Sequence, residues 1–261
     1  MSEIYLQRDQ PEGVPPLALT GERTLPDIPQ ENYWYRRHEA VYNWIAPRIA
    51  GLRVIDMACG EGYGAAVLAK QAASVVGVDA NPEAFEHARL RYATQKLSFA
   101  RDLVGSFDAP CDAITFLQTI EHVEDPGALL DHFCSLLGRY ANGSGEVAYI
   151  STPNLVTLAG PDAQKSENPW HVREYRAQEY MQLCCAHFSQ VELFGLFHAR
   201  KLRVHEWALR LGWDHLHKRL GITDRFYGWF TPAISASDFR LVRGGPEELT
   251  GALDFIAVCR P

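Results

Sequence analysis

The sequence predicts an α/β protein built on a doubly wound, mostly parallel sheet. Short β-branched runs alternate with helical stretches between residues 53 and 154, and the first of these runs leads directly into a glycine-rich turn. The chain has 261 residues, of which 47% are hydrophobic and 22% charged. This composition suits one large domain or a core with a lid, and it excludes disordered and collagen-like proteins.

The alternation of strands and helices predicts where the ligand binds. We expect strands at 53–58, 74–79, 96–101, 111–117 and 145–151, separated by helical stretches at 64–72, 82–93 and 126–140. Strands joined by helical crossovers pair in parallel, and such sheets bind ligands at the carboxyl ends of their strands. The final stretch, 253–261, is expected to add a short antiparallel strand that closes the sheet.

The regions that flank this core differ from it in composition. We divide the chain into an N-terminal arm and helix (1–50), a ligand-binding core (51–154), an α-rich lid (155–245) and a closing strand (246–261). Within the first segment, apolar side chains recur at helical spacing from Asn32 onward. Within the third, residues 196–220 read as one long basic helix or two.

Charge and hydropathy narrow the possible partners. The formal net charge of −7 gives no general attraction for nucleic acids. No apolar stretch reaches the roughly 20 residues that a membrane span needs, and the first residues lack the apolar core of a secretion signal. The six cysteines show no CxxC spacing. We therefore expect a cytoplasmic protein, monomeric or homodimeric, without stable membrane association.

The glycine-rich turn carries the strongest local signal. Asp56 lies in the first strand, four residues before the first glycine, and the strand leads into Cys59-Gly60-Glu61-Gly62-Tyr63-Gly64. Glycines let a backbone approach a ligand closely, and this spacing also fits a nicotinamide dinucleotide site. However, the Asp56 carboxylate would repel a pyrophosphate and suits a cationic ligand. Asp79, which ends the second strand, can accept both ribose hydroxyls, and Asp102, after the third, can reach an adenine amino group.

These residues, together with Ile120-Glu121-His122, resemble the motifs of class I S-adenosylmethionine-dependent methyltransferases. The resemblance implies S-adenosylmethionine as cofactor and assigns its contacts residue by residue. Asp56 and Gly60 would lie beside the methionine amino group, Glu61, Gly62 and Tyr63 along the loop, Asp79 and Asn81 at the ribose, Asp102 and Leu103 at the adenine, and Gln118 near the sulfonium. A dinucleotide oxidoreductase is the less favoured alternative.

Four further motifs resemble bacterial polysaccharide methyltransferases, above all the mycobacterial and actinobacterial enzymes of polymethylated mannose and glucose polysaccharides. They are Thr20–Arg23, Glu31–His38, Ser151–Asn154 and Asn168–Glu174. The resemblance implies an oligosaccharide acceptor, methylated on the 1-hydroxyl of a short 3-O-methylated mannoside precursor of methylmannose polysaccharide. Aromatic faces and a few polar groups suit a sugar ring. The candidate acceptor contacts are Tyr33, Trp34, Arg37, Asn154 and Trp170.

Methylation of an alcohol requires a group that removes the hydroxyl proton. His122 follows the fourth strand and is our first candidate for this general base, with Glu121 orienting it; His171 is the second. A bound Mg²⁺ could lower the pKa of the hydroxyl instead, for which Glu121 and Asp125 are weak candidate ligands.

Three other functions stay open at this point. One is 6-O-methylation of a glucose polysaccharide, and another is O-methylation of a quinone or phenol, whose flat ring would stack on the same aromatic residues. The third is a non-catalytic protein that only binds the nucleoside.

Overall fold

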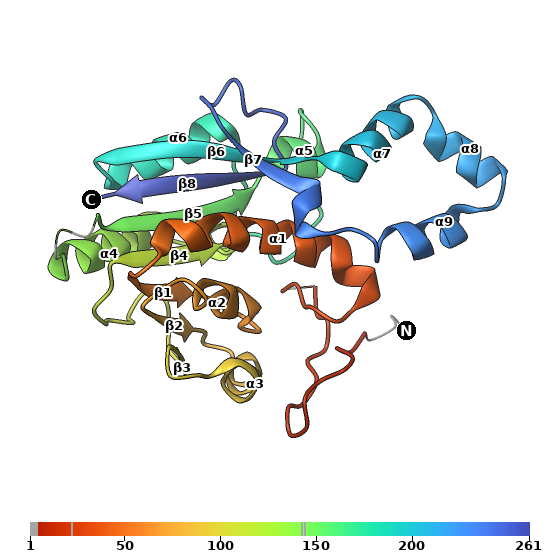
Figure 1. The fold of residues 1–261 in the computed structure, drawn as a ribbon. Helices are drawn as coiled ribbons and strands as arrows, with labels where there is room; N and C mark the ends of the chain where they lie inside the picture. Colours follow the sequence, from red (N-terminus) through yellow and green to blue (C-terminus); the bar gives the residue numbers. More distant parts are fainter. Residues whose placement is uncertain (1–4, 22, 142, 144) are drawn as a thin grey trace.

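The computed structural model describes residues 5–21, 23–141, 143 and 145–261, so Glu22 of the Thr20–Arg23 motif lies outside the described residues. Its centre is an eight-stranded sheet in the order β3-β2-β1-β4-β5-β8-β6-β7 (Figure 1). The first five strands of that order pair in parallel. They are β3 (Leu97–Ala100), β2 (Ser74–Val78), β1 (Arg53–Met57), β4 (Ala113–Leu117) and β5 (Val147–Pro153). The predicted fold class is confirmed.

Three antiparallel strands complete the sheet. β8 (Asp254–Arg260), the expected closing strand, pairs with β5 on one side and with β6 (Gln190–His198) on the other, and β7 (Phe239–Arg243) forms the edge. β6 and β7 were not predicted. The helical interpretation of 196–220 was wrong at its start, because pairing with β8 places Leu196 in the buried core and the helix begins only at Arg200.

Helices cover both faces of the sheet. α1 (Asn32–Ile45) and α2 (Tyr63–Leu68) share one apolar cluster with Val54 of β1, whereas α4 (Pro126–Arg139) and α6 (Ala177–His187) share the other with Ile55. Successive strand residues point to opposite faces, so a strand covered on both sides becomes apolar throughout. The remaining helix of the core, α3 (Pro82–Tyr92), packs beside β3. Short 3₁₀ turns occupy Pro29–Glu31, Ala46–Ile49, Ile120–His122 and Ala236–Asp238.

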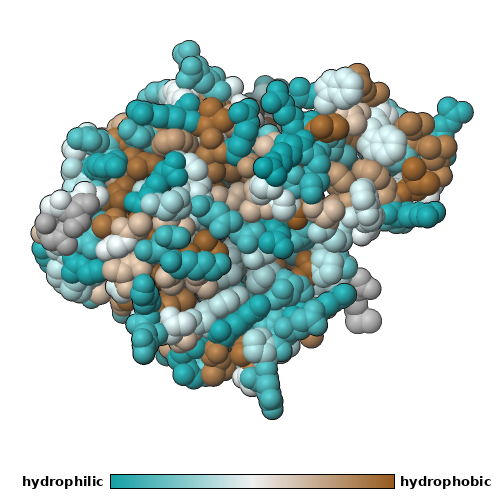
Figure 2. Space-filling view, in the orientation of Figure 1, coloured by the Kyte–Doolittle hydropathy of each residue, from teal (hydrophilic) through white to brown (hydrophobic). Residues whose placement is uncertain are grey.

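A helical projection extends from one end of the sheet (Figure 1). It consists of α7 (Arg200–Arg210), α8 (Trp213–Arg219) and α9 (Thr223–Phe230), and the short α5 (Leu155–Ala159) follows β5. Inside the projection, the rings of His205 and Phe230 lie 4.7 Å apart and those of Trp213 and Phe226 5.3 Å apart. Its aromatic residues therefore form a small core of their own, while apolar side chains gather on its outer surface (Figure 2). No helix within the described residues is long and apolar enough to cross a membrane.

A buried ion pair joins α1 to the sheet. Arg37 Nε lies 2.7 Å from Asp254 Oδ2, and Arg37 Nη2 donates to the carbonyl of Leu253 at 2.7 Å. Only 5% of Arg37 and 1% of Asp254 are exposed. Removing one partner of such a pair leaves an uncompensated charge in the interior. The pair thus fixes α1, which carries one wall of the cavity described below.

We predict that Arg37→Met will lower the free energy of unfolding by about 3–5 kcal/mol, because Asp254 then keeps a buried charge without its partner. Urea unfolding at pH 7 measures the change. The double variant Arg37→Met/Asp254→Leu should recover most of the loss. If the free energy of unfolding of Arg37→Met is lower by less than about 1 kcal/mol, the ion pair does not stabilise the fold in this way.

Candidate active site

A cavity of about 780 Å³ lies at the carboxyl ends of β1, β2 and β4. The segments that follow those strands, 58–61, 79–81 and 118–122, form its floor. Residues of the N-terminal arm, of α1 and of the 168–171 segment form its walls. The cavity therefore occupies the edge of the sheet where the sequence predicted the ligand site.

The glycines of the loop after β1 serve three different purposes. Gly60 has φ +55°, and a Cβ there would meet no atom within 4 Å, so this backbone is open to the cavity. Gly62 has φ +96°, and its Cβ would come within 2.8 Å of the Ala88 Cβ, which makes it a packing glycine. A Cβ on Gly64 would overlap the Tyr42 ring. Of the three, only Gly60 brings backbone to the cavity surface.

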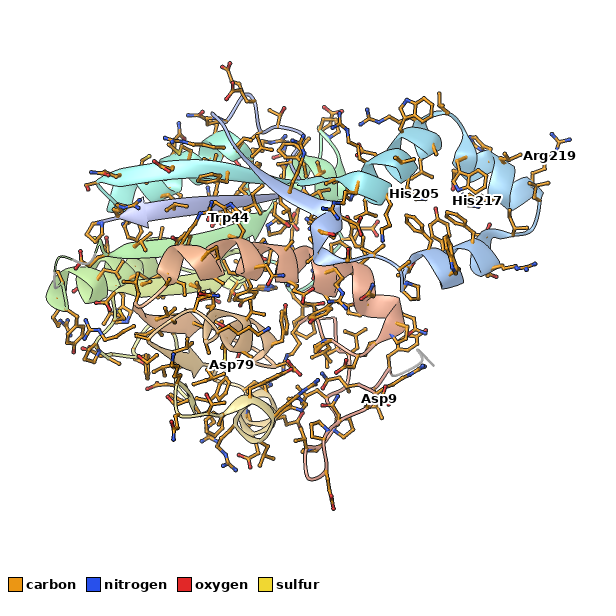
Figure 3. The ribbon with its side chains drawn as sticks, viewed as in Figure 1. Asp9, Trp44, Asp79, His205, His217 and Arg219 are labelled. Atoms are coloured by element: carbon orange, nitrogen blue, oxygen red, sulfur yellow. The ribbon has the colours of Figure 1, made fainter. Side chains whose placement is uncertain are left out.

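Asp79 ties the loop to the neighbouring strand (Figure 3). Its Oδ2 accepts from the Gly60 amide at 2.8 Å and its Oδ1 from the Asn81 amide at 2.9 Å. Asn81 in turn caps α3 by accepting from the amides of Glu83 and Ala84, each at 3.0 Å. Asp79 and Asn81 both line the cavity beside Gly60, which gives this end of the cavity a half-buried carboxylate.

Asp56 is placed differently from the expectation. Its carboxylate is fully buried and does not line the cavity; it accepts from Thr115 Oγ1 at 2.6 Å and from the Tyr42 hydroxyl at 3.3 Å. Burial raises the pKa of Asp56 to about 7, although these hydrogen bonds oppose the rise. The expectation of an ionised carboxylate directly beside the ligand is corrected: Tyr42 lines the cavity and contacts Asp56 behind it.

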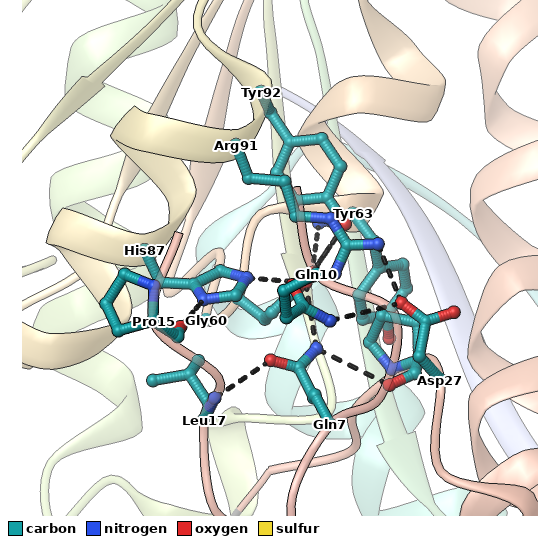
Figure 4. Close-up of polar contacts among 12 residues, drawn as sticks. Gln7, Gln10, Pro15, Leu17, Asp27, Gly60, Tyr63, His87, Arg91 and Tyr92 are labelled. Carbon is teal, nitrogen blue, oxygen red and sulfur yellow. Dashed lines mark hydrogen bonds and ion pairs between the residues drawn. The ribbon is translucent and has the colours of Figure 1, made fainter. Parts of the chain in front are cut away.

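Glu61 connects the N-terminal arm to the core. Figure 4 shows the polar contacts among Gln7, His87, Arg91 and Tyr92 in this region. The buried Glu61 carboxylate accepts from Gln7 Nε2 at 3.0 Å, from Arg91 Nη1 at 2.9 Å and from the Tyr92 hydroxyl at 3.0 Å, and it contacts His87 Nε2 at 3.0 Å. His87 Nδ1 also bonds the Pro15 carbonyl of the arm at 2.8 Å. The arm is therefore anchored to α3, and its residues Gly21, Arg23 and Thr24 reach the cavity wall.

The three predicted catalytic residues converge in the same cavity. Glu121, His122 and His171 each offer a donor atom, and these atoms lie within 4.8 Å of one another. The backbone carbonyl of Glu121 accepts from the amides of Val172 (2.8 Å) and Arg173 (3.1 Å), which fastens the 168–174 segment to the 3₁₀ turn. The two histidines, distant in sequence, meet because of this contact.

Hydrogen bonds orient each member of the cluster. His122 Nδ1 bonds the Trp170 carbonyl at 2.8 Å, so Nδ1 carries the proton and Nε2 is the basic nitrogen. His171 Nδ1 lies 2.5 Å from Glu174 Oε1, and the Asn168 amide donates to His171 Nε2 at 2.9 Å. Glu121 is buried, accepts from Thr152 Oγ1 at 3.1 Å, and has a pKa raised by burial to about 8.

Most of the other predicted site residues also line the cavity. Besides the catalytic three, Gly60, Asp79 and Asn81, these are Glu61, Tyr63, Leu103, Gln118, Trp34, Arg37 and Trp170. The Gln118 Nε2 donates to Ser151 Oγ at 3.0 Å. Trp34 and Trp170 are 41% and 51% exposed, although the Arg37 guanidinium lies over the Trp34 ring at 5.0 Å from its centroid. Arg37, by contrast, donates from Nε and Nη2 to Asp254 and to the Leu253 carbonyl.

Five of the residues predicted to bind the cofactor or the acceptor lie outside the cavity lining, and each makes other contacts. Asn154 is fully buried, donates to the carbonyls of Thr250 and Ala252, and caps α5. Its assignment to the acceptor site is therefore corrected, since no polar atom of its side chain is left over. Asp102 caps its own loop at Leu103 and Ser106, and Tyr33 bonds His198 Nε2 at 2.8 Å. The other two are Asp56 and Gly62, described above.

The candidate metal ligand Asp125 is also placed apart from the cluster. Its Oδ1 caps α4 by accepting from the Ala128 amide at 2.9 Å, and it is absent from the donor group formed by Glu121, His122 and His171. The metal-ligand interpretation of Asp125 is accordingly corrected.

Sequence reasoning missed several cavity residues. His38 and Tyr42 lie in the stretch that the sequence predicted as a helix, and neither was given a role, yet both line the cavity. Burial lowers the pKa of His38 to about 4, so this imidazole is neutral near pH 7. The sequence signal for these residues was that two side chains able to form hydrogen bonds fall on the buried face of one predicted helix. Asn168, which contacts His171, lay within a noted motif but was given no role.

Comparison with known proteins agrees with this geometry. The profile of the Methyltransferase domain family matches residues 30–206. A probable S-adenosylmethionine-dependent methyltransferase of Mycobacterium tuberculosis is 35% identical over 251 residues, covering 93% of this chain and 89% of that protein. A ubiquinone biosynthesis O-methyltransferase of Xylella fastidiosa is 35% identical over 125 residues, covering 45% of this chain and 49% of that protein.

Solved structures show the same fold at low sequence identity. The [4+2]-cyclase SpnF has a TM-score of 0.52 at 17% identity and covers 87% of this chain and 81% of its own. An S-adenosylmethionine-dependent methyltransferase from Mesorhizobium loti has a TM-score of 0.52 at 15% identity, covering 86% and 98%. The chain belongs to the class I S-adenosylmethionine-dependent methyltransferase family, and S-adenosylmethionine is its cofactor.

The residues present fit that cofactor. Gly60 leaves open space where a Cβ would stand, Asp79 presents a carboxylate beside it, and the cavity is large enough for a nucleoside with a tail and an acceptor. Three further carboxylates, Glu31, Glu61 and Glu121, line the same cavity. Because Arg91 pairs with Glu61 and burial raises the pKa of Glu121 to about 8, it is chiefly the Asp79 carboxylate beside Gly60 that favours a cationic sulfonium over a pyrophosphate.

We predict that Gly60→Ala will weaken S-adenosylmethionine binding at least tenfold, because its Cβ would occupy the cavity surface. Gly51→Ala is the matched control: Gly51 has φ +75° and equally open surroundings, but it lies outside the cavity. Both variants should lose about 1–2 kcal/mol of stability through left-handed backbone strain. Calorimetric titration separates them. Equal cofactor affinity in the two variants would contradict the assignment of this loop.

We also predict a pH dependence of stability that depends on Asp56. The folded protein holds the Asp56 proton up to about pH 7, whereas an unfolded aspartate loses it near pH 4. Between these values the folded state binds more protons, so the free energy of unfolding falls with rising pH, by about 1.4 kcal/mol per pH unit for this group. The Asp56→Asn variant should lack this contribution to the pH dependence of the free energy of unfolding. Urea unfolding between pH 5 and 8 tests it, and identical slopes in both proteins would refute it.

Proposed function

We propose that this methyltransferase methylates a hydroxyl group of an oligosaccharide. The observation that carries the proposal is the cluster of Glu121, His122 and His171 in the same cavity as the glycine loop. An alcohol needs a proton acceptor at the moment its oxygen attacks. Two oriented imidazoles supply one, and a protein that only bound the nucleoside would not need them.

The cofactor is assigned to the end of the cavity formed by Gly60, Asp79 and Asn81. The Asp79 carboxylate would accept the ribose hydroxyls, Leu103 would cover the adenine, and Gln118 would lie toward the methionine portion. When bound, S-adenosylmethionine supplies an electrophilic methyl group on a sulfonium and leaves as S-adenosylhomocysteine. The protein holds the acceptor oxygen in line with that methyl group.

The cluster is assigned to the acceptor hydroxyl. His122 Nε2 takes the hydroxyl proton while Nδ1–H stays bonded to the Trp170 carbonyl. Glu121 Oε1, 4.0 Å from His122 Nε2, favours the protonated imidazole once its own carboxyl group is ionised. His171, oriented by Glu174, is the second candidate for the base.

One observation supports a sugar acceptor. Trp34 and Trp170 are partly exposed and line the cavity, and apolar aromatic planes suit the faces of a sugar ring. The similarity to the Mycobacterium tuberculosis methyltransferase covers 93% of the chain and so extends beyond the cofactor-binding core, but the name of that protein states no acceptor. Within this class we favour the 1-hydroxyl of a short 3-O-methylated mannoside, a precursor of methylmannose polysaccharide, over the 6-hydroxyl of a glucose polysaccharide.

O-methylation of a quinone or phenol is the second candidate. It is favoured by the similarity to a ubiquinone biosynthesis O-methyltransferase, which covers 45% of this chain. A direct comparison decides between them: labelled S-adenosylmethionine is offered with 3-O-methylated mannobiose, a glucose oligosaccharide and a catechol. We expect transfer to the mannoside. Transfer to the catechol alone would replace the proposed acceptor class.

We predict that His122→Ala will lower kcat for methyl transfer about 10²- to 10⁴-fold, the usual contribution of a general base. The dissociation constant for S-adenosylmethionine should stay within a factor of about three. His187→Ala serves as control, because His187 pairs with Asp131 at 2.7 Å outside the cavity. Rates are measured by release of S-adenosylhomocysteine. An unchanged kcat in His122→Ala would transfer the role to His171.

A further inference from the structure

The arrangement of Glu121, His122 and His171 points to a metal centre. We propose that these three side chains bind one divalent transition-metal ion, of which Zn²⁺ is the best match, in the acceptor part of the cavity. Binding is argued from geometry alone; only its role in catalysis rests on the proposed O-methylation.

The donor atoms are close enough to share an ion. All three lie within 4.8 Å of one another, while ligands around a tetrahedral zinc, with bonds of about 2.1 Å, stand roughly 3.4 Å apart. The widest separation therefore needs to contract by up to about 1.4 Å, which side-chain rotation can supply. Glu121 and His171 are buried and His122 is partly buried, so an ion here would be shielded on several sides.

The partners of the two histidines match those of metal-bound imidazoles. A ligating histidine almost always gives its second N–H to a carbonyl or a carboxylate, which fixes its orientation. His122 Nδ1 meets the Trp170 carbonyl, and His171 Nδ1 meets Glu174. Glu174 is itself fixed by the backbone amide of Ser166 at 2.6 Å and by the Ser166 hydroxyl. Because each Nδ1 is engaged in this way, Nε2 is the ring nitrogen of each histidine that would bind the ion.

The side-chain amide of Asn168 competes with the ion for His171 Nε2. The Asn168 amide donates to His171 Nε2 at 2.9 Å, and Asn168 Oδ1 accepts from the Trp170 amide. This single neutral hydrogen bond would give way to a metal bond. Binding should therefore move Asn168 while leaving the Glu174 contact in place.

The donor set selects the class of metal. Mg²⁺ demands oxygen ligands and keeps several waters, whereas two imidazoles with one carboxylate suit Zn²⁺, Co²⁺ or Fe²⁺. Three protein ligands are also typical of catalytic zinc sites, which keep a further position for water or substrate. The Mg²⁺ expectation from sequence is thus replaced by a nitrogen-preferring ion.

The ion would acidify the acceptor. A hydroxyl oxygen bound at the remaining position loses its proton more readily, as metal-bound water does. The proton passes to water in the cavity, the oxygen forms its bond to the methyl carbon, and the electron pair of the broken sulfur–carbon bond stays on sulfur. In this form of the reaction the histidines act as ligands.

The test begins with binding. The full-length protein is stripped with a chelator, dialysed, and titrated with Co²⁺ followed by visible absorption, and with Zn²⁺ by calorimetry. We expect one ion per chain, with affinity reduced at least 100-fold in His122→Ala and His171→Ala. Glu174→Gln should lower the affinity about 10- to 100-fold, because it removes only the orienting carboxylate. His187→Ala, outside the cavity, should bind as the wild type does.

Circular dichroism and thermal unfolding establish that each variant is folded. If an alanine variant does not fold, the nearly isosteric Glu121→Gln variant takes its place in the binding experiment. Absence of stoichiometric binding, or equal binding in the wild type and the histidine variants, would overturn the site.

Methyl transfer is measured in the same samples. We expect the stripped enzyme to lose at least 90% of its rate and to regain it with Zn²⁺ or Co²⁺ but not with Mg²⁺. A full rate in metal-free protein would overturn the metal's catalytic role and leave the proposed function intact. Stoichiometric binding without transfer to any sugar or catechol would instead sustain the site and overturn the proposed function.

Discussion

The parallel pairing of β1 with both β2 and β4 is the constraint on which this structure depends. Its register sets Asp56 opposite Gly77 on one side and opposite Thr115 on the other. The three segments that follow these strands are therefore forced to one edge of the sheet, where they meet the cavity. The Asp79–Gly60 hydrogen bond locks two of them together, and the Glu121 carbonyl recruits the 168–174 segment to the third.

Buried charges then decide which side chains are available for chemistry. Glu61 and Arg37 both border the cavity, yet each is engaged by fixed partners that attach the arm and α1 to the core. Asp56 and Glu121 lack such a cationic partner among the hydrogen bonds described, and burial raises their pKa values to about 7 and about 8. Glu61 and Arg37 thus hold the walls of the cavity in place, whereas Glu121 can still exchange a proton or bind an ion.

Prediction from the sequence succeeded where the determinants were contiguous. The turn around Gly60 and the strand-end position of Asp79 follow from local patterns that any parallel sheet would place alike. It failed where a contact joins segments that are distant in the sequence. Asn154 was predicted to contact the acceptor, but its side-chain amide donates to the carbonyls of Thr250 and Ala252. His122 and His171 were each named, but their convergence with Glu121 depends on backbone pairing that no local pattern records. Strand β6 was hidden for the same reason, because its burial depends on β8.

The most direct test is a crystal structure of the protein with S-adenosylhomocysteine and 3-O-methylated mannobiose. The ribose hydroxyls should lie within hydrogen-bonding distance of the Asp79 carboxylate, and one sugar hydroxyl should lie within about 3.5 Å of His122 Nε2, or of an ion held there. A nucleoside bound away from Asp79, or a sugar whose hydroxyls all lie far from Glu121, His122 and His171, would contradict the assignment of this site.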